Sequence, residues 1–474
     1  MLTAERLRVL SNYARLAAGF GVGLLFVPLM LRLDRDASAA VALLTTGLGI
    51  HLLLREVLVS GVTPVLAEAA HCRRPRRLPH VRAAADRVAW AVAGLTLVAY
   101  AGVAAAVPRL GVSAEMAAAA RWFLLARGAH GVLLVLLAPA MTMYVARGRM
   151  VEHNLWLVLE RLSELAAIAA TLVWFGRSAE AVVAYGVIVS VLQASVAVFA
   201  AVRMRRTERC PRHRVSRRGF GYVARSVTSN SLVVLANALY VRVDVLMMSA
   251  LAGPLATLAF DVATRLSGYV RMATRGLTGG IEAVAAKVAV APAKAGPGDV
   301  GSQTAGPALA GAARLFRVSL WSQAAVVVPL AAGLMLFSGG VLTAWVGPRL
   351  AEKELPVGSV AAVLNWMVLA VAFRGLTEGW LRIIAGMGEV DRLLRPTLLM
   401  ACANPLLVAA WWFVGVEDLA VAAAATFAVS MGVLHLIVIP RAAVRVSGSP
   451  LRELVLGGRP EVRQTPAPPR RRAA

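Results

Sequence analysis

Hydrophobic positions along this chain come in long unbroken runs rather than in short alternating stretches. About 20 apolar residues in a helix cross the roughly 30 Å hydrocarbon core of a bilayer, whereas strands of a membrane barrel alternate over about 10 residues. The runs are of the first kind. They predict membrane-spanning helices near 11–31, 38–69, 88–107, 117–146, 154–175, 180–202, 226–252, 255–286, 315–346, 357–387, 396–415 and 418–440.

The composition supports this interpretation. Of 474 residues, 59% are hydrophobic and 16% are charged, and the mean hydropathy is +0.71, far from the composition of soluble domains. The first apolar run is too long for the core of a signal peptide, so we expect a retained first helix. Cys72, Cys210 and Cys402 show no CxxC spacing, so the sequence indicates no disulfide framework and no metal site.

The positive charges alternate between successive loops. The formal net charge is +25, and 34 of the 50 Lys and Arg residues fall at the N-terminus, in every second loop and in the C-terminal tail, against seven in the intervening loops. This is the distribution that the positive-inside rule describes, and it predicts a multi-pass protein with both termini in the cytoplasm. The basic excess therefore reflects topology and attraction to anionic headgroups, and no nucleic-acid partner is expected.

The two halves of the chain resemble each other weakly. SGVTPVLAEAA at 60–70 and RGLTGGIEAVA at 275–285 lie at equivalent places in spans two and eight, as expected of a duplicated six-span unit. The longest basic loop separates the halves. We therefore predict an all-α polytopic membrane protein with about twelve transmembrane helices in two six-helix lobes around a central cavity: an N-terminal lobe at 1–202, a basic cytoplasmic inter-lobe loop at 203–225, a C-terminal lobe at 226–446 and a basic, flexible cytoplasmic tail at 447–474.

Nine arginines lie inside the predicted spans, where each would cost about 2.5 to 3.5 kcal/mol at the bilayer centre. In AFDVATRLSGYVRMATRGLTGG (259–280), helical spacing puts Asp261, Arg265, Arg271 and Arg275 on one face. Such a face needs a hydrated or charged neighbour. The predicted substrate-binding residues are Arg55, Arg127, Arg242, Arg265, Arg271, Arg275, Arg374 and Arg382, and the acids with which H⁺ or Na⁺ coupling would be tested are Asp244, Asp261 and Glu378.

A structural role for these charges is the main alternative. Asp261 with Arg265, and Glu378 with Arg374 or Arg382, have the i,i+4 spacing of ion pairs within one helix. The arginines nevertheless outnumber their plausible acidic partners. Because guanidinium is a planar fork that matches phosphate oxygens, the ligand that fits a cationic cavity is a lipid-linked pyrophosphate or an acidic sugar chain.

Three stretches carry a family resemblance: SNYARLAAGFGVGLLFVPLMLRL, LANALYVRVDVLMMSALAGPLATLAFDVATRLSGYV and EGWLRIIAGMGEVDRLLRPTLLMACANPLLVAAW. They resemble Wzx-type oligosaccharide flippases of the multidrug/oligosaccharidyl-lipid/polysaccharide exporter superfamily. The resemblance implies two lobes in a V that alternate between inward-open and outward-open states. It also implies transport of polyprenyl-pyrophosphate-linked oligosaccharide across the bacterial inner membrane, and a cationic cavity onto which Arg55, Arg242, Arg265, Arg271 and Arg374 map.

The same resemblance implies no cofactor and no catalytic residues, and its partners would be membrane lipids and other proteins of polysaccharide assembly. Two further functions compete with it. A drug or metabolite antiporter of the same superfamily would favour acidic and aromatic cavity residues. A membrane oligosaccharide polymerase or ligase would carry a long outer loop, whereas every predicted outer loop here is short, and no HExxH, GxSxG or Walker pattern indicates an enzyme.

Overall fold

The computed structural model describes residues 4–71, 77–110, 112–208, 217–278, 281, 285, 305–387, 389 and 391–457. Within these ranges the side chains at 4–6, 8–9, 47, 71, 77, 229–242, 275–277, 305–310, 386 and 391 lie outside the description. The described residues fold into helices joined by short turns, as the apolar runs predict. The described part of the chain therefore confirms the all-α fold class.

The first half of the chain forms the helical segments from α1 to α7. Their bounds are α1 Ala4–Met30, α2 Arg35–Ala42, η1 Leu43–Gly47, α3 Ile50–His71, α4 Arg77–Ala106, η2 Val107–Arg109, α5 Ala114–Ala146, α6 Met150–Trp174 and α7 Ala179–Thr207.

The described part of the second half continues with eleven further segments. Their bounds are α8 Arg217–Met247, η3 Met248–Ala252, α9 Gly253–Leu277, α11 Ala305–Leu336, α12 Ser338–Ala351, α13 Val357–Gly386, α14 Asp391–Val414, α15 Leu419–Gly432, η5 Val433–Val438, α16 Ile439–Ser447 and, after a short turn, α17 Leu451–Leu456.

Ten helical segments of the described chain are long and apolar enough to cross a membrane. Two further helices have comparable length: α6, with 25 residues, and α8, with 31. α6 carries Glu160, Arg161 and Glu164, which lower its hydropathy. Large apolar side chains such as Val98, Val173 and Leu406 are exposed on the outside of the helices, where lipid is the expected neighbour. The protein is thus a multi-pass membrane protein.

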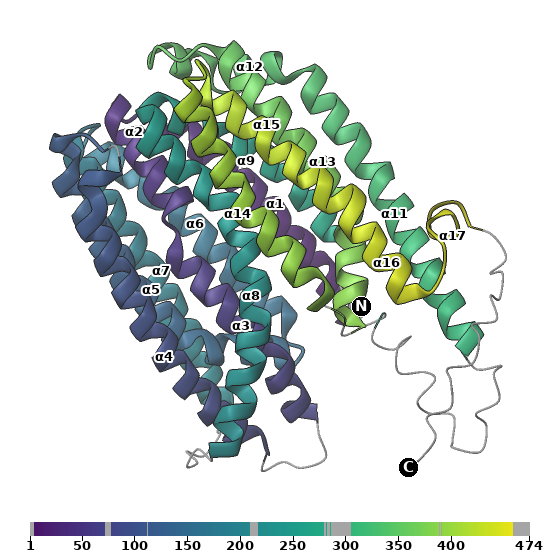
Figure 1. The fold of residues 1–474 in the computed structure, drawn as a ribbon. Helices are drawn as coiled ribbons and strands as arrows, with labels where there is room; N and C mark the ends of the chain where they lie inside the picture. Colours follow the sequence, from purple (N-terminus) through teal and green to yellow (C-terminus); the bar gives the residue numbers. More distant parts are fainter. Residues whose placement is uncertain are drawn as a thin grey trace.

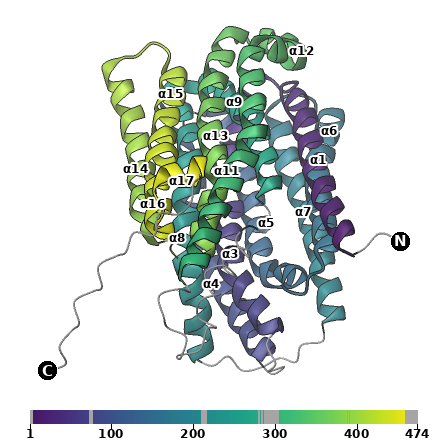
Figure 2. The same ribbon diagram turned by 90° about the vertical axis from the view of Figure 1, so that its right-hand side faces the viewer.

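The helices form two bundles with α8 between them (Figures 1 and 2). In the first bundle α5 packs against α3, α4 and α7, while α6 packs against α1 and α7. In the second bundle α13 packs against α9, α11 and α15, and α14 packs against α15. Helix α8 contacts both, through α3 and α4 on one side and α14 on the other. Figure 1 shows α2 and α12 at one shared end of the molecule, which we call the α2/α12 end.

At the α2/α12 end the two bundles touch directly. Here α1, α2 and η1 pack on α9, and α1 also contacts α12. Gly23 of α1 lies so close to the ring of Tyr269 on α9 that a Cβ atom there would collide with its hydroxyl. The GxxxG spacing of Gly19 and Gly23 therefore serves close helix packing between the bundles, as such motifs commonly do.

Polar contacts between the bundles reinforce this closure. Arg35 and Glu354 form an ion pair of 3.1 Å, the ammonium of Lys353 donates to the carbonyl of Leu33, and Nε1 of Trp345 donates to the carbonyl of Leu24 at 2.8 Å. Lys353 lies in the turn between α12 and α13, outside the spans. Burial lowers the pKa of its ammonium below the ordinary value of 10.5, while Asp34 opposes that shift.

Several boundaries differ from the sequence prediction. The span expected at 38–69 is α2, then the π-helical turn η1, then α3, and the span expected at 315–346 is divided into α11 and α12. Helix α7 runs to Thr207 and α8 begins at Arg217, so helix occupies much of the stretch 203–225 that was predicted as a loop. The predicted flexible tail begins with α17, whose Val455 carbonyl accepts a hydrogen bond from Trp321 at 2.8 Å. Hydropathy runs cannot reveal these features, because they depend on contacts between distant helices.

Candidate functional site

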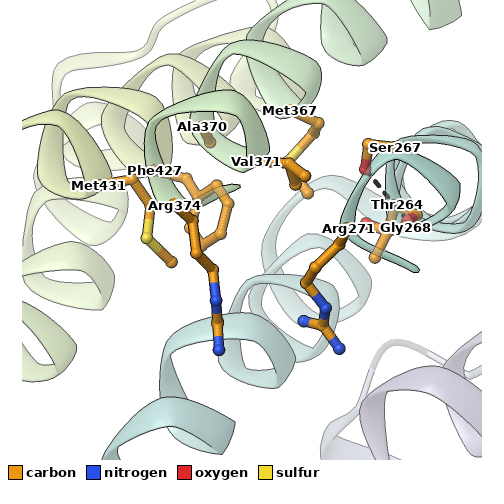
Figure 3. A pocket seen from close by; sticks show the side chains of 10 residues that line it. All are labelled: Thr264, Ser267, Gly268, Arg271, Met367, Ala370, Val371, Arg374, Phe427 and Met431. Atoms are coloured by element: carbon orange, nitrogen blue, oxygen red, sulfur yellow. Dashed lines mark hydrogen bonds between the residues drawn. The ribbon is translucent and has the colours of Figure 1, made fainter. Parts of the chain in front are cut away.

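A small pocket of about 30 Å³ lies inside the second bundle between α9, α13 and α15 (Figure 3). Arg271 of α9 and Arg374 of α13 line it from two sides, and their guanidinium groups extend toward the same side of the pocket (Figure 3). The remaining lining is small or apolar: Thr264, Ser267, Gly268, Met367, Ala370, Val371, Phe427 and Met431. Two guanidinium groups beside an apolar wall suit a ligand that has both a negative charge and an apolar chain.

The stripe on α13 carries more positive than negative charge. Nε of Arg374 donates to Glu378 at 3.3 Å, and Nη2 of Arg382 donates to the other oxygen of the same carboxylate at 3.4 Å. One carboxylate thus serves two guanidinium groups. The predicted i,i+4 pairs on this helix are both present.

Asp261 and Arg265 form the second predicted ion pair, with 2.8 Å between Nε and Oδ2. Both residues reach across to the first bundle. Thr46 of η1 donates to Asp261, Nη2 of Arg265 donates to the hydroxyls of Thr45 and Thr46 at 2.9 and 3.0 Å, and its guanidinium lies 4.9 Å from the centre of the Phe26 ring. This pair holds the π-helical turn of the first bundle against α9.

Arg265 and Arg271 therefore contact different neighbours, although the sequence predicted one shared face for Asp261, Arg265 and Arg271. Six residues at 100° each separate Arg265 from Arg271 by about 120° around the helix. This separation is enough to aim Arg265 at α1 and η1 while Arg271 lines the pocket with α13.

Arg55 and Arg127 lie in the first bundle. Nη1 of Arg55 contacts both carboxylate oxygens of Glu160 at 3.1 and 3.0 Å. Arg127 is 7% exposed and donates to Oε1 of Gln193 at 2.9 Å and to Nε2 of His51 at 3.0 Å. The structure therefore places Arg127 among buried polar side chains, away from the pocket between α9 and α13.

Asp244 is buried in α8 and accepts a hydrogen bond of 2.6 Å from Asn404 of α14. The predictions for Arg242 and Arg275 concern side chains that lie outside the described part of the structure. Among the described residues no group of three or more His, Cys, Asp or Glu side chains is arranged to hold a metal ion.

The sequence reasoning missed three members of the buried group around Arg127: His51, Tyr100 and Gln193. They come from α3, α4 and α7, and no spacing within any one of these helices links them to Arg127.

No protein-family model matches the chain, and no curated protein sequence matches it. Solved structures do match. A MATE multidrug resistance transporter of the MOP superfamily, in an inward-facing conformation, gives a TM-score of 0.69 at 13% identity, covering 94% of this chain and 99% of that one. A MOP superfamily transporter from Pyrococcus furiosus, described by the reverse polarity of its binding pocket, gives 0.65 at 13% identity, with 93% and 96% covered. The lipid II flippase MurJ, in an inward closed conformation, gives 0.63 at 12% identity, with 94% and 91% covered.

These likenesses extend over nearly the whole of each chain. At 12 to 13% identity they show the fold. The chain therefore has the same overall helical fold as these three transporters.

Proposed function

We propose that this protein is a transporter of the MOP type that moves a polyprenyl-pyrophosphate-linked oligosaccharide across a bacterial cytoplasmic membrane by alternating access, for cell-surface polysaccharide synthesis. The observation that carries the proposal is the convergence of Arg271 and Arg374 from two helices on one pocket. The neighbouring Arg382, which shares the Glu378 carboxylate with Arg374, adds a third guanidinium group on α13 and supports it.

The pocket's chemistry favours a phosphate ligand. A pyrophosphate presents several oxygens that two guanidinium forks can contact at once, and each such charge-assisted hydrogen bond contributes about 1.5 to 3 kcal/mol. Met367, Phe427 and Met431 supply an apolar wall on which the first carbons of a lipid chain would pack. The pocket itself measures only about 30 Å³. A pyrophosphate group would therefore contact the two guanidinium groups at the open side of the pocket, and the sugars would extend into the space between the bundles.

The charge asymmetry of the loops supports an orientation. The loops that hold Arg35, Arg177 and Lys353 lie at the α2/α12 end and are the charge-poor set. By the positive-inside rule this end faces outward and both termini lie in the cytoplasm. The structure would then be the state that is closed toward the outside, in which the lipid-linked substrate enters from the cytoplasmic leaflet.

The direct test is a flipping assay in vesicles. Purified protein would be reconstituted with a fluorescent polyprenyl-pyrophosphate-linked oligosaccharide, and the fraction reaching the opposite leaflet would be followed by quenching. We expect Arg271→Ala and Arg374→Ala to insert normally and to flip about 10-fold more slowly or worse, because each loses about 1.5 kcal/mol or more of phosphate contact. Arg203→Ala is the matched control, since Arg203 is an exposed arginine of α7 paired with Glu152, and it should flip at the wild-type rate. Wild-type rates in both pocket variants would refute the assignment.

An antiporter of drugs or metabolites is the second candidate. The apolar wall of Met367, Val371 and Phe427 also fits an uncharged aromatic compound, and the MATE transporter shares the fold. The two functions differ in what the arginines do. Two results together would favour the antiporter. The Arg271→Ala variant would still export a cationic dye from energised cells, and the wild type would not flip the lipid-linked oligosaccharide.

A further inference from the structure

A buried polar cluster with two histidines occupies the centre of the first bundle. His51 and His130 are 2% and 3% exposed, and their rings meet edge to face with 5.5 Å between centroids. Gly131 lies against His51 so closely that a Cβ atom would overlap it, and this contact lets α3 and α5 approach. The transport site between α9 and α13 uses neither histidine.

The donors around His51 fix the position of its proton. A guanidinium can only donate, so Nε2 of His51 accepts from Nη2 of Arg127 at 3.0 Å. The ring proton then lies on Nδ1, which contacts the hydroxyl of Tyr100 at 2.5 Å. That hydroxyl in turn donates to the carbonyl of Leu48 at 3.3 Å. In this conformation His51 is therefore neutral.

The same reasoning applies to His130. Its Nδ1 lies 3.4 Å from Nη1 of Arg127 and acts as an acceptor, which places the ring proton on Nε2. Within the described part of the chain, that buried Nε2 atom has no hydrogen-bond partner. A buried imidazole without a partner for its proton costs free energy, and another conformation could recover that cost.

The charged groups around the cluster decide what a further proton would do. Arg127 faces both imidazoles from α5, and Arg55 lies on α3 itself. Glu160, Arg161 and Glu164 lie on α6, and Gln193 of α7 links Glu164 to Arg127 through hydrogen bonds of 3.3 and 2.9 Å. Among the described residues, the other titratable neighbours are Tyr100 of α4, Tyr185 of α7 and, beyond Tyr185, the Arg265 and Asp261 pair of α9. The side chains of α8 at 229–242, which also packs on α3, lie outside the described residues.

Of these described groups, four carry a positive charge (Arg55, Arg127, Arg161 and Arg265) and three a negative one (Glu160, Glu164 and Asp261) when both histidines are neutral. A proton on Nε2 of His51 would place a second cation about 3 Å from the Arg127 guanidinium, and such like-charge contacts are strongly unfavourable away from water. The hydrogen bond from Arg127 to His51 would break.

The cluster connects to the contact between the bundles through η1. Leu48, whose carbonyl accepts from Tyr100, follows directly after η1, and its N–H donates to Leu43 at the start of that turn at 3.0 Å. Thr45 and Thr46 of η1 hold Arg265 and Asp261 of α9. A displaced imidazole therefore lies only one side chain and one turn of backbone away from the inter-bundle contact.

We propose that His51 and His130 form a proton-binding site in the first bundle, and that its occupancy weakens the contact of η1 with Arg265 and Asp261 and so favours opening at the α2/α12 end. Protons favour the conformation that binds them more tightly. Here that is a conformation in which Arg127 has left His51. Acidification should therefore shift the population away from the closed α2/α12 end, whatever substrate the protein carries.

The test measures the distance between the bundles without any substrate. Spin labels would be placed on Glu115→Cys of α5 and Thr343→Cys of α12, both exposed near the α2/α12 end, in a background with Cys72, Cys210 and Cys402 changed to Ser. Distance distributions by electron double resonance in lipid nanodiscs at about pH 8 and about pH 5 bracket the range in which imidazole titrates. For the wild type we expect a longer-distance population that grows at least about 3-fold on acidification.

The variants His51→Gln, His130→Gln and the double substitution then test the site. Gln can accept from Arg127 and donate to Tyr100 in place of His51 without titrating, so the fold should be retained, and the melting temperature at about pH 8 checks this. We expect the double variant to show no growth of the long-distance population. His435→Gln is the matched control, because His435 is equally buried in the second bundle beside Thr377, and it should respond like the wild type.

Tyr100→Phe tests the connection. It leaves both histidines in place but removes the hydroxyl between His51 and Leu48, so the acid response should fall by at least about half. A wild type that does not respond to acid, a double histidine variant that responds fully, or a His435→Gln variant that loses the response would each overturn the proposal. Because none of these measurements involves transport, a failed flipping assay would leave the outcome unaffected.

Discussion

Two regions of this protein hold arginine within the membrane, and they differ in what borders it. In the first bundle Arg127 is 7% exposed and donates to Gln193 and to the two histidines. In the second bundle Arg271 and Arg374 line a small pocket, and Arg374, which is 9% exposed, also pairs with Glu378. The first arginine is surrounded by acceptors of the protein itself. The other two border a cavity in addition to their protein neighbours.

This difference shows why an arginine in a span does not by itself mark a binding site. The insertion cost of a guanidinium can be offset by neighbouring protein groups, as at Arg127 and in the Arg55 and Glu160 pair. It can also be offset by hydration in a cavity and by an anionic ligand. The neighbours decide between the two, and substitutions should separate them.

The largest effect is expected on transport when both pocket arginines are removed. Arg271→Ala combined with Arg374→Ala should lower the flipping rate about 100-fold or more, because two phosphate contacts of about 1.5 kcal/mol each are lost. The melting temperature should fall less than that of Arg127→Met, because Glu378 keeps Arg382 as an ion-pair partner when Arg374 is removed. A reconstituted flipping assay beside thermal unfolding in detergent measures both, and a double variant that melts early but flips normally would reverse the distinction between the regions.

The opposite pattern is expected for Arg127. Arg127→Met leaves Gln193 and His51 without their donor in a buried environment and should lower the free energy of unfolding by about 3 kcal/mol. Arg161→Met is the control, because its side chain is 54% exposed, and its loss should cost about 0.5 kcal/mol or less. Chemical unfolding of both variants in detergent measures the two losses of stability. Equal losses would show that burial does not set the stabilising contribution of these two arginines.

A smaller effect is expected at the contact that joins the two regions. A double-mutant cycle with Asp261→Asn and Thr46→Val should give a coupling free energy of about 1 kcal/mol, because these side chains share a hydrogen bond across the bundles. Thermal unfolding at a single pH measures it. The pair Thr343→Val and Asp261→Asn is the matched non-contacting cycle and should give a coupling near zero, since Thr343 bonds only within α12. Equal couplings in the two cycles would argue against a direct contact.

The smallest effect concerns Lys353 at the α2/α12 end. Burial lowers its pKa in the folded protein below 10.5, so the unfolded chain binds the proton more tightly. The free energy of unfolding should therefore gain a contribution that rises with pH between the folded pKa and 10.5. Lys353→Gln should remove that part of the slope in melting temperatures measured from about pH 8 to pH 11. An unchanged slope would contradict the assigned cause.

The sequence predicted most of the fold because hydropathy and loop charge depend on neighbouring residues alone. It also predicted the Asp261 with Arg265 and Glu378 with Arg374 pairs, since i,i+4 spacing is local. It did not predict the π-helical turn η1, because nothing in LLTTG specifies that turn without the Asp261 and Arg265 side chains that hold its threonines.

The buried cluster was missed for the same physical reason. His51, Tyr100 and Gln193 are separated from Arg127 by 27 to 76 positions, and only the packing of four helices brings them together. Conversely, the sequence placed Arg127 with the pocket arginines because all of them are cations in apolar spans. A count of charges contains no information about which side of a bundle each one faces.

The central claim is that Arg271 and Arg374 bind the pyrophosphate of a lipid-linked sugar, and a binding measurement tests it most directly. A water-soluble, short-chain prenyl pyrophosphate oligosaccharide would be titrated against protein in detergent, with the matching monophosphate as the comparison ligand. We predict that wild type prefers the pyrophosphate, and that Arg271→Ala and Arg374→Ala each weaken its binding by about 10-fold or more while Arg203→Ala does not. Equal affinities for the pyrophosphate in the wild type and both pocket variants would contradict the account.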